Sequence, residues 1–193
     1  MEEKRKIGID IDDVVVVSLK RYLKFFNLKL GKNLEFEDIV KYHVWDLTDS
    51  VSKEECLSMV IEVHNSENEN NVEMVKGAKE AIWNLAKNYK IFFITSRPPS
   101  VKEHTSTLFK KIFLNLDFEI IFSGEIHGGK TKSEICLENE INVIIEDNAG
   151  YALDCAKKGI KSFLLEKPWN QQYEKHENLI KVKNWDNILN QLK

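Results

Sequence analysis

The sequence predicts an α/β protein built on a doubly wound parallel sheet, Rossmann-like in its core, with a small helical cap. Short apolar segments typical of strands alternate with segments whose apolar residues recur at helical spacing, and such alternation favours a parallel sheet covered on both faces. The length of 193 residues suits about one domain, at roughly 150 residues each, with an insertion. Apolar residues make up 42% of the chain and charged residues 31%, a composition that supports a packed core.

The first two predicted elements are a strand and a long helix. Residues 6–12 alternate between apolar and polar side chains over a compact stretch, which is typical of a strand. Residues 14–30 carry Leu19, Leu23 and Phe26 at helical spacing. We therefore expect a helix that begins at residue 14.

The next segment of the chain differs in its residue pattern from the alternating strands and helices. Ser52 and Glu55 form a capping-box pattern, and apolar residues repeat behind them at helical spacing. The polar tract of residues 65–71 is typical of a linker. We therefore expect residues 18–71 to form a small helical cap inserted after the first strand, with a long surface loop as the alternative. The α/β core then consists of residues 1–17 and 72–193.

Helices and strands alternate regularly in the rest of the chain. The predicted helices cover residues 78–85, 101–113, 132–138 and 149–158, and the predicted strands cover residues 89–95, 118–122, 143–146 and 160–165. A short strand and a final helix fit residues 179–193. Ligands of such sheets bind at the carboxyl ends of the strands, so the residues that follow each strand are the candidates for function.

Reactive residue types gather at these strand ends. They are Asp10 and Asp12 at the end of the first strand, Thr95, Ser96 and Arg97 at the end of the second, and Glu146 and Asp147 at the end of the strand predicted over residues 143–146. Lys130 and Lys132 lie around the start of the helix predicted over residues 132–138. Carboxylates beside buried strands are costly to keep ionised without a counter-charge, and a hard cation such as Mg²⁺ supplies one. Hydroxyl, arginine and lysine side chains suit a phosphate group. The pattern indicates metal-assisted phosphoryl transfer.

The order of these residues resembles the signature of the haloacid dehalogenase-like superfamily of phosphohydrolases. That signature is an apolar strand ending in Asp-x-Asp, a strand ending in Thr or Ser, a Lys, and a strand ending in an acidic pair. Within the superfamily the chain most resembles the 5′(3′)-deoxyribonucleotidase-like group. The resemblance covers nearly the whole chain and is carried by Gly-Ile-Asp-Ile-Asp-Asp-Val at residues 8–14, Thr-Ser-Arg-Pro at 95–98, Ile-Glu-Asp-Asn at 145–148 and Lys-Pro-Trp-Asn at 167–170.

The resemblance implies Mg²⁺-dependent hydrolysis of a phosphomonoester, with a nucleoside monophosphate as the expected substrate. Asp10 would be the nucleophile that forms an aspartyl-phosphate. Asp12 would protonate the leaving oxygen and then deprotonate the attacking water. The implied phosphate-binding residues are Thr95, Ser96, Lys132, Lys130 and Arg97, and the implied Mg²⁺ ligands are Asp10, Asp12, Asp147 and Glu146. Arg97 can instead brace the loop before Pro98.

Either Lys130 or Lys132 could be the lysine of the signature, and the segment around them also matches a nucleotide-binding pattern. Lys132 begins a predicted helix at a spacing from Asp147 that resembles the family, whereas Lys130 lies on a glycine loop. We expect Lys132 to neutralise the nucleophile and the phosphate. However, Gly124, Lys130 and Thr131 also match the P-loop pattern Gly-x₄-Gly-Lys-Thr, so an ATP-binding protein is an alternative. That alternative leaves the paired aspartates without a role.

The remaining expectations concern partners and surroundings. Phe26, Tyr42 and Trp45 lie in the predicted cap, where they would either stack on a nucleobase or form cap core. The net charge of −3 without blocks of like charge argues against a nucleic acid polymer as partner, and nothing approaches the ~20 apolar residues that span a membrane. Three separated cysteines indicate free thiols and a cytoplasmic location. A non-nucleotide phosphate ester and a homodimer are options that the sequence leaves open.

Overall fold

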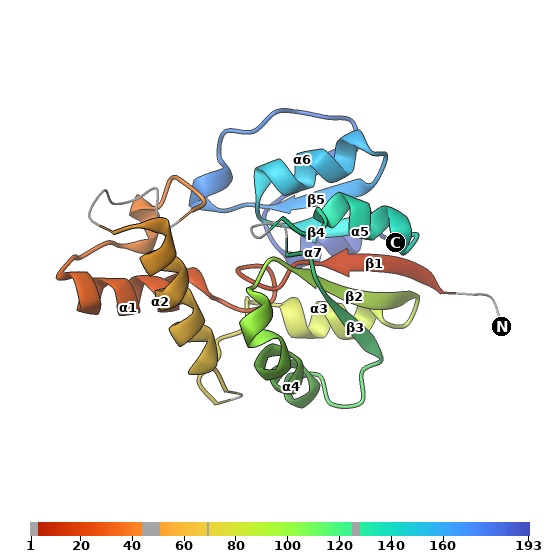
Figure 1. The fold of residues 1–193 in the computed structure, drawn as a ribbon. Helices are drawn as coiled ribbons and strands as arrows, with labels where there is room; N and C mark the ends of the chain where they lie inside the picture. The colour runs from red at the N-terminus through yellow and green to blue at the C-terminus, as the bar shows by residue number, and fades with distance from the viewer. Residues whose placement is uncertain (1–3, 44–50, 69, 125–127) are drawn as a thin grey trace.

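The computed structural model describes residues 4–43, 51–68, 70–124 and 128–193. Within these ranges the predicted α/β architecture is confirmed, because six parallel strands form one sheet in the order β3-β2-β1-β4-β5-β6 (Figure 1). The strands are β1 (Arg5–Ile9), β2 (Tyr89–Thr95), β3 (Phe118–Phe122), β4 (Val143–Glu146), β5 (Lys161–Leu165) and β6 (Leu179–Val182). The chain reverses its direction of travel across the sheet between β1 and β4, and a ligand crevice is expected at such a switch point.

Helices cover both faces of this sheet, as alternating side chains of β2 show. Phe93 packs in one cluster with residues of α3, α4 and α7, whereas its neighbours Phe92 and Ile94 pack in another with residues of α5 and α6. The helices are α1 (Leu19–Leu30), α2 (Lys53–Asn65), α3 (Ala78–Leu85), α4 (Lys102–Ile112), α5 (Lys132–Glu138), α6 (Ala149–Lys157) and α7 (Trp185–Gln191). Short 3₁₀ turns are η1 (Phe36–Asp38), η3 (Pro99–Val101) and η5 (Pro168–Asn170).

Two helices, α1 and α2, which we call the cap helices, lie beyond the carboxyl ends of the strands (Figure 1). They pack against each other through a small apolar cluster that includes Phe26, Cys56 and Met59. The capping box expected at the start of α2 is confirmed: the Glu55 amide donates to the Ser52 hydroxyl at 3.2 Å, and the Ser52 amide donates to the Glu55 carboxylate at 2.9 Å. The sheet edge that carries the candidate residues therefore faces these helices.

The first helix begins later than the periodicity predicts. Residues 13–16 form a turn in which Asp13 has a φ of +58°, and the amides of Val15 and Val16 donate to the Ile11 carbonyl. The Asp13 carboxylate then accepts hydrogen bonds from the amides of Ser18 and Leu19, so it caps α1. The prediction of a helix from residue 14 is wrong because these valines are buried in a turn and do not line a helix.

Two further expectations can be compared with the structure. All three cysteines are free, as predicted, and all three are buried. In the part of the chain that the structure describes, no helix has both the length and the apolar character needed to cross a membrane.

Candidate active site

A buried ion-pair group lies at the carboxyl ends of β1 and β4. Asp10 directly follows β1, is 3% exposed, and contacts the ammonium of Lys132, which also contacts Glu146. The second oxygen of Glu146 accepts from the backbone amides of Asp147 and Asn148 at 2.7 and 2.8 Å. Both oxygens of Glu146 are therefore engaged, and this residue holds Lys132 against Asp10.

Local sequence explains how Lys132 reaches this position. The Thr131 hydroxyl accepts from the Glu134 amide at 3.2 Å and the Glu134 carboxylate accepts from the Thr131 amide at 2.8 Å, which fixes the start of α5. Lys132 is the first residue of that helix and is almost fully buried. Lys130 is arranged differently, because its side chain is 59% exposed and pairs with Glu138 at 2.6 Å.

Two carboxylate oxygens in this group have no hydrogen-bond partner among the described residues. They are Oδ2 of Asp10 and Oδ1 of Asp147, and both are buried. The other Asp147 oxygen accepts from the Trp169 indole at 3.0 Å, and the Asn170 amide donates to the Asp147 backbone carbonyl at 2.8 Å. Ligand atoms of Asp10, Glu146 and Asp147 lie within 4.8 Å of one another. Buried oxygens that lack donors in a cluster of carboxylates fit a hard divalent cation.

The electrostatics of the group agree with a cation site. Burial raises the pKa of Asp10 to about 8, although the charge of Lys132 lowers it in part. Burial likewise raises the pKa of Asp147 well above its usual value, and the neighbouring charges of Glu146 and Asp10 add to this effect. Burial lowers the pKa of Lys132, but the charges of Asp10 and Glu146 outweigh burial and raise it. A bound divalent cation would favour the ionised form of both aspartates.

Asp12 lies in a different environment from the other acids. Arg97 donates to it in a bidentate pair, Nε to Oδ2 at 2.9 Å and Nη2 to Oδ1 at 2.7 Å, and the Ser18 hydroxyl also contacts Oδ1. Burial alone would raise the pKa of Asp12, but the charge and hydrogen bonds of Arg97 hold it below its usual range. Among the described residues, the grouped ligand atoms come from Asp10, Glu146 and Asp147, and the structure does not bring the Asp12 side chain into that group.

The hydroxyl residues after β2 lie at the same edge. Thr95 is fully buried, and its hydroxyl oxygen accepts from the Arg97 amide at 3.1 Å. Ser96 lines the cleft, and its hydroxyl lies 3.1 Å from that of Ser123. The structure thus brings Thr95 and Ser96 to the strand ends that carry the acids, while it pairs Arg97 with carboxylates.

A cleft separates this edge from the cap helices. Its core side is formed by Asp10, Asp12, Asp13, Ser96, Arg97 and Asp147, and the remaining lining residues include Leu19, Tyr22, Tyr42, Leu57, Val60, His64 and Trp169. Of the two positions that the sequence allows for Tyr42, the cap core or a substrate cleft, the structure places it in the cleft lining. Phe26 does not line this cleft, since it is 1% exposed and packs against Cys56 and Met59 in the cap core. Trp45 lies outside the described residues.

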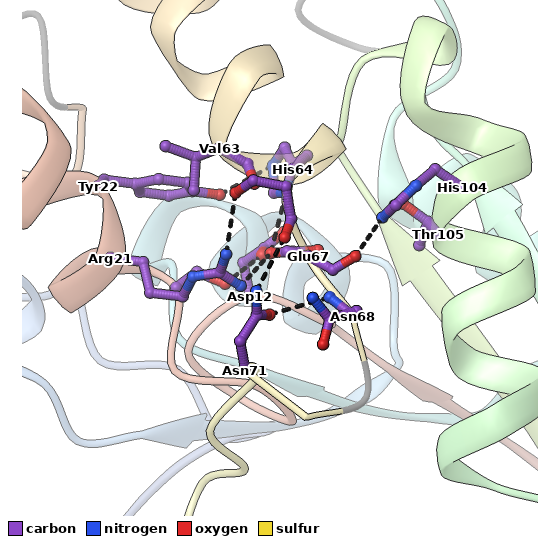
Figure 2. Close-up of polar contacts among 12 residues, drawn as sticks. Asp12, Arg21, Tyr22, Val63, His64, Glu67, Asn68, Asn71, His104 and Thr105 are labelled. Atoms are coloured by element: carbon purple, nitrogen blue, oxygen red, sulfur yellow. Dashed lines mark hydrogen bonds and ion pairs between the residues drawn. The ribbon is translucent and has the colours of Figure 1, made fainter.

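A buried polar cluster that the sequence patterns do not predict lies beside Asp12 (Figure 2). Glu67 lies in the tract predicted to be a linker, yet it is 3% exposed and accepts from Arg97 Nη1 at 2.8 Å. His64 contacts Glu67 through Nδ1 at 3.3 Å and the Tyr22 hydroxyl through Nε2 at 2.9 Å. The linker prediction is wrong for Glu67, because a partner thirty positions away in the chain holds it inside. In the sequence, the one indication of such a cluster is Arg97, a charged residue placed at the end of a buried strand.

The P-loop alternative is not favoured by this geometry. Thr131 serves as the N-cap of α5, and Lys130 lies at the surface with Glu138. Part of the loop, residues 125–127, lies outside the described residues.

Comparisons with known proteins identify the family and the fold of the chain. The sequence model of the family described as 5′ nucleotidase, deoxy (pyrimidine), cytosolic type C protein matches residues 4–192. The chain is 25% identical over 185 residues to YqfW of Bacillus subtilis (strain 168), covering 93% of this chain and 89% of that protein. It is 24% identical over 186 residues to Nucleotidase CA_C3379 of Clostridium acetobutylicum, covering 96% and 92%. The fold is similar to that of SP0104, a haloacid dehalogenase-like family hydrolase from Streptococcus pneumoniae, with a TM-score of 0.70, 13% identity and full coverage of both chains.

Proposed function

The chain belongs to the family of 5′ nucleotidases, deoxy (pyrimidine), cytosolic type C, and from this premise we propose that it hydrolyses nucleoside monophosphates with Mg²⁺ through an aspartyl-phosphate on Asp10. The observation that carries the proposal is the pair of buried oxygens on Asp10 and Asp147, beside Lys132, that have no hydrogen-bond partner among the described residues. Mg²⁺ held by these carboxylates would bind the phosphate and neutralise the charge that develops on it.

Each residue of the site has a part in this proposal. A carboxylate oxygen of Asp10 attacks phosphorus, and the bond to the ester oxygen breaks as Asp12 gives that oxygen a proton. Asp12 is ionised in its pair with Arg97, and the negative charge of a phosphate bound beside it favours the protonated form that this step requires. Asp12 then takes a proton from the water that hydrolyses the aspartyl-phosphate. Lys132 offsets the negative charge of nucleophile and phosphate, while Glu146 keeps Lys132 in place. Thr95 and Ser96 supply hydroxyl groups at the phosphate position.

The cleft supports a substrate with an apolar, planar portion. Tyr42 and Trp169 line it together with aliphatic side chains of the cap helices, and such surfaces suit a nucleobase. The cap helices would exclude bulk water from the phosphate. A cytoplasmic location fits the three free thiols.

Phosphate release from a panel of esters tests this proposal. The panel contains ribo- and deoxyribonucleoside 5′- and 3′-monophosphates together with sugar phosphates, each assayed with Mg²⁺ and after exhaustive chelation. We expect hydrolysis of nucleoside monophosphates that chelation stops and Mg²⁺ restores, and no turnover by Asp10→Asn. Hydrolysis that survives chelation, or that persists in Asp10→Asn, would exclude the proposed chemistry.

A further inference from the structure

Arg97 is shared between two carboxylates that come from different parts of the fold. Its Nε and Nη2 face Asp12, while Nη1 donates to Glu67 at 2.8 Å and to the Thr105 hydroxyl at 3.2 Å. The side chains of Arg97 and Glu67 are each 1% exposed. The planar guanidinium is therefore fixed by acceptors on more than one side, and one of these acceptors is the carboxylate of Asp12.

Glu67 is itself held from several directions, most of them from the cap helices. His64 Nδ1 lies 3.3 Å from its carboxylate, and Arg21 Nη1 lies 3.4 Å from it. On the core side, His104 Nε2 lies 2.7 Å from the Glu67 backbone carbonyl. Figure 2 shows Glu67 between Arg21 and Tyr22 of α1, His64 of α2, His104 of α4 and Asp12. Glu67 thus lies at the junction between the cap helices and the core.

Such a cluster is difficult to explain as a device for stability alone. A buried ion pair recovers little more than the desolvation of its charges, and an apolar replacement of similar volume often serves stability as well. A buried network does, however, hold side chains in one arrangement. Asp12 gains most from this, because it faces the cleft and must present one carboxylate oxygen to the ester oxygen of the substrate.

We propose that Glu67 is a positioning residue, which acts through Arg97 to orient the Asp12 carboxylate toward the leaving group when the cap helices are packed on the core. The inference rests on the proposed function, in which Asp12 is the proton donor. Without the Glu67 charge, Arg97 Nη1 keeps the Thr105 hydroxyl and at most a neutral amide oxygen at position 67, so the guanidinium is held less firmly on that side. Asp12 then loses its fixed orientation, while Asp10, Lys132 and the cation ligands are untouched.

A matched pair of substrates separates this role from a general loss of folded enzyme. Phenyl phosphate and p-nitrophenyl phosphate have similar shapes, but phenolate leaves poorly without a proton whereas p-nitrophenolate leaves readily. General acid catalysis contributes about 10²–10⁴-fold where it is needed. We expect Glu67→Gln to lower kcat/KM for phenyl phosphate about tenfold or more, and that for p-nitrophenyl phosphate less than about threefold.

Three other variants complete the experiment. Asp12→Asn is the reference and should show the same selectivity to a larger degree. Glu62→Gln makes the same change on α2, where Glu62 forms an exposed pair with Lys29 of α1, and both substrates should be hydrolysed as by the wild type. Met59→Ala weakens the packing between the cap helices without touching Arg97, so any loss should be equal for both substrates.

The outcomes distinguish the inference from the function on which it rests. Equal losses on both substrates in Glu67→Gln, with selectivity retained in Asp12→Asn, overturn the positioning role alone. No selectivity in Asp12→Asn overturns both the role of Asp12 and the inference. If Glu67→Gln does not fold, Glu67→Asp, which draws the charge back by one methylene, is measured in the same way. An unchanged ratio of the two kcat/KM values in that variant overturns the inference.

Discussion

Replacement of Lys132 by methionine tests the arrangement at the centre of the site. Lys132 is almost fully buried and contacts Asp10 and Glu146, whose side chains are 5% and 0% exposed. Lys132→Met keeps the aliphatic stem and removes the charge, which leaves two buried carboxylates without that counter-charge. Breaking a buried pair from one side destabilises a protein by about 3–5 kcal/mol. Since 1 kcal/mol shifts the Tm of a chain this size by about 2–4 °C, we expect a fall of about 6–20 °C.

The matched control is the other lysine of the same segment. Lys130 pairs with Glu138 at the surface, and such pairs contribute about 0–1 kcal/mol, so Lys130→Met should lower the Tm by about 4 °C at most. Turnover should fall about 10²–10³-fold in Lys132→Met, in line with loss of one stabilising group, and should change little in Lys130→Met. Calorimetry and initial rates on one nucleoside monophosphate measure both effects. Equal effects of the two substitutions would refute the reasoning.

Three further predictions address other parts of the molecule. Trp169→Phe removes the donor to Asp147 and should weaken Mg²⁺ binding about 10–100-fold by calorimetric titration; unchanged affinity would contradict this. Burial and the charge of Arg97 hold the pKa of His64 below its usual 6.5, so the unfolded state binds more protons than the folded state and stability falls as the pH drops below about 6.5. In His64→Gln the urea midpoint should change less with pH in this range, and an unchanged pH dependence would contradict the prediction. Phe26→Ala should cost about 3–5 kcal/mol of stability with KM unchanged, whereas Tyr42→Ala should raise KM; the reverse pattern would exclude our placement of the two rings.

Sequence patterns predict those elements whose signal is local. The strand at residues 89–95 and the helix that begins at Lys132 lie where the sequence places them. An apolar run is sufficient for the first, and the Thr131–Glu134 capping box fixes the second. Because parallel strands end at one edge, the meeting of Asp10 with Asp147 also follows from the order of the elements.

Features that depend on contacts with residues far away in the sequence cannot be predicted from such local patterns. The valines after Asp13 fit a helical repeat, but the positive φ of Asp13 and their burial in the core make them a turn. Glu67 has the surroundings of a solvated tract, and only Arg97 on another element accounts for its burial. The split of roles between Glu146 and Asp147 likewise depends on which oxygen meets Lys132 or Trp169, which spacing does not reveal.

Detection of the covalent intermediate tests the central claim most directly. Wild-type protein is mixed with Mg²⁺ and a nucleoside monophosphate, quenched in acid within the first turnover, and digested for peptide mapping by mass spectrometry. The account predicts one phosphoryl group on Asp10, absent from Asp10→Asn and retained longer in Asp12→Asn. The account would be contradicted if the substrate is hydrolysed but neither the wild type nor Asp12→Asn carries a phosphoryl group on Asp10, or if the phosphoryl group lies on another residue.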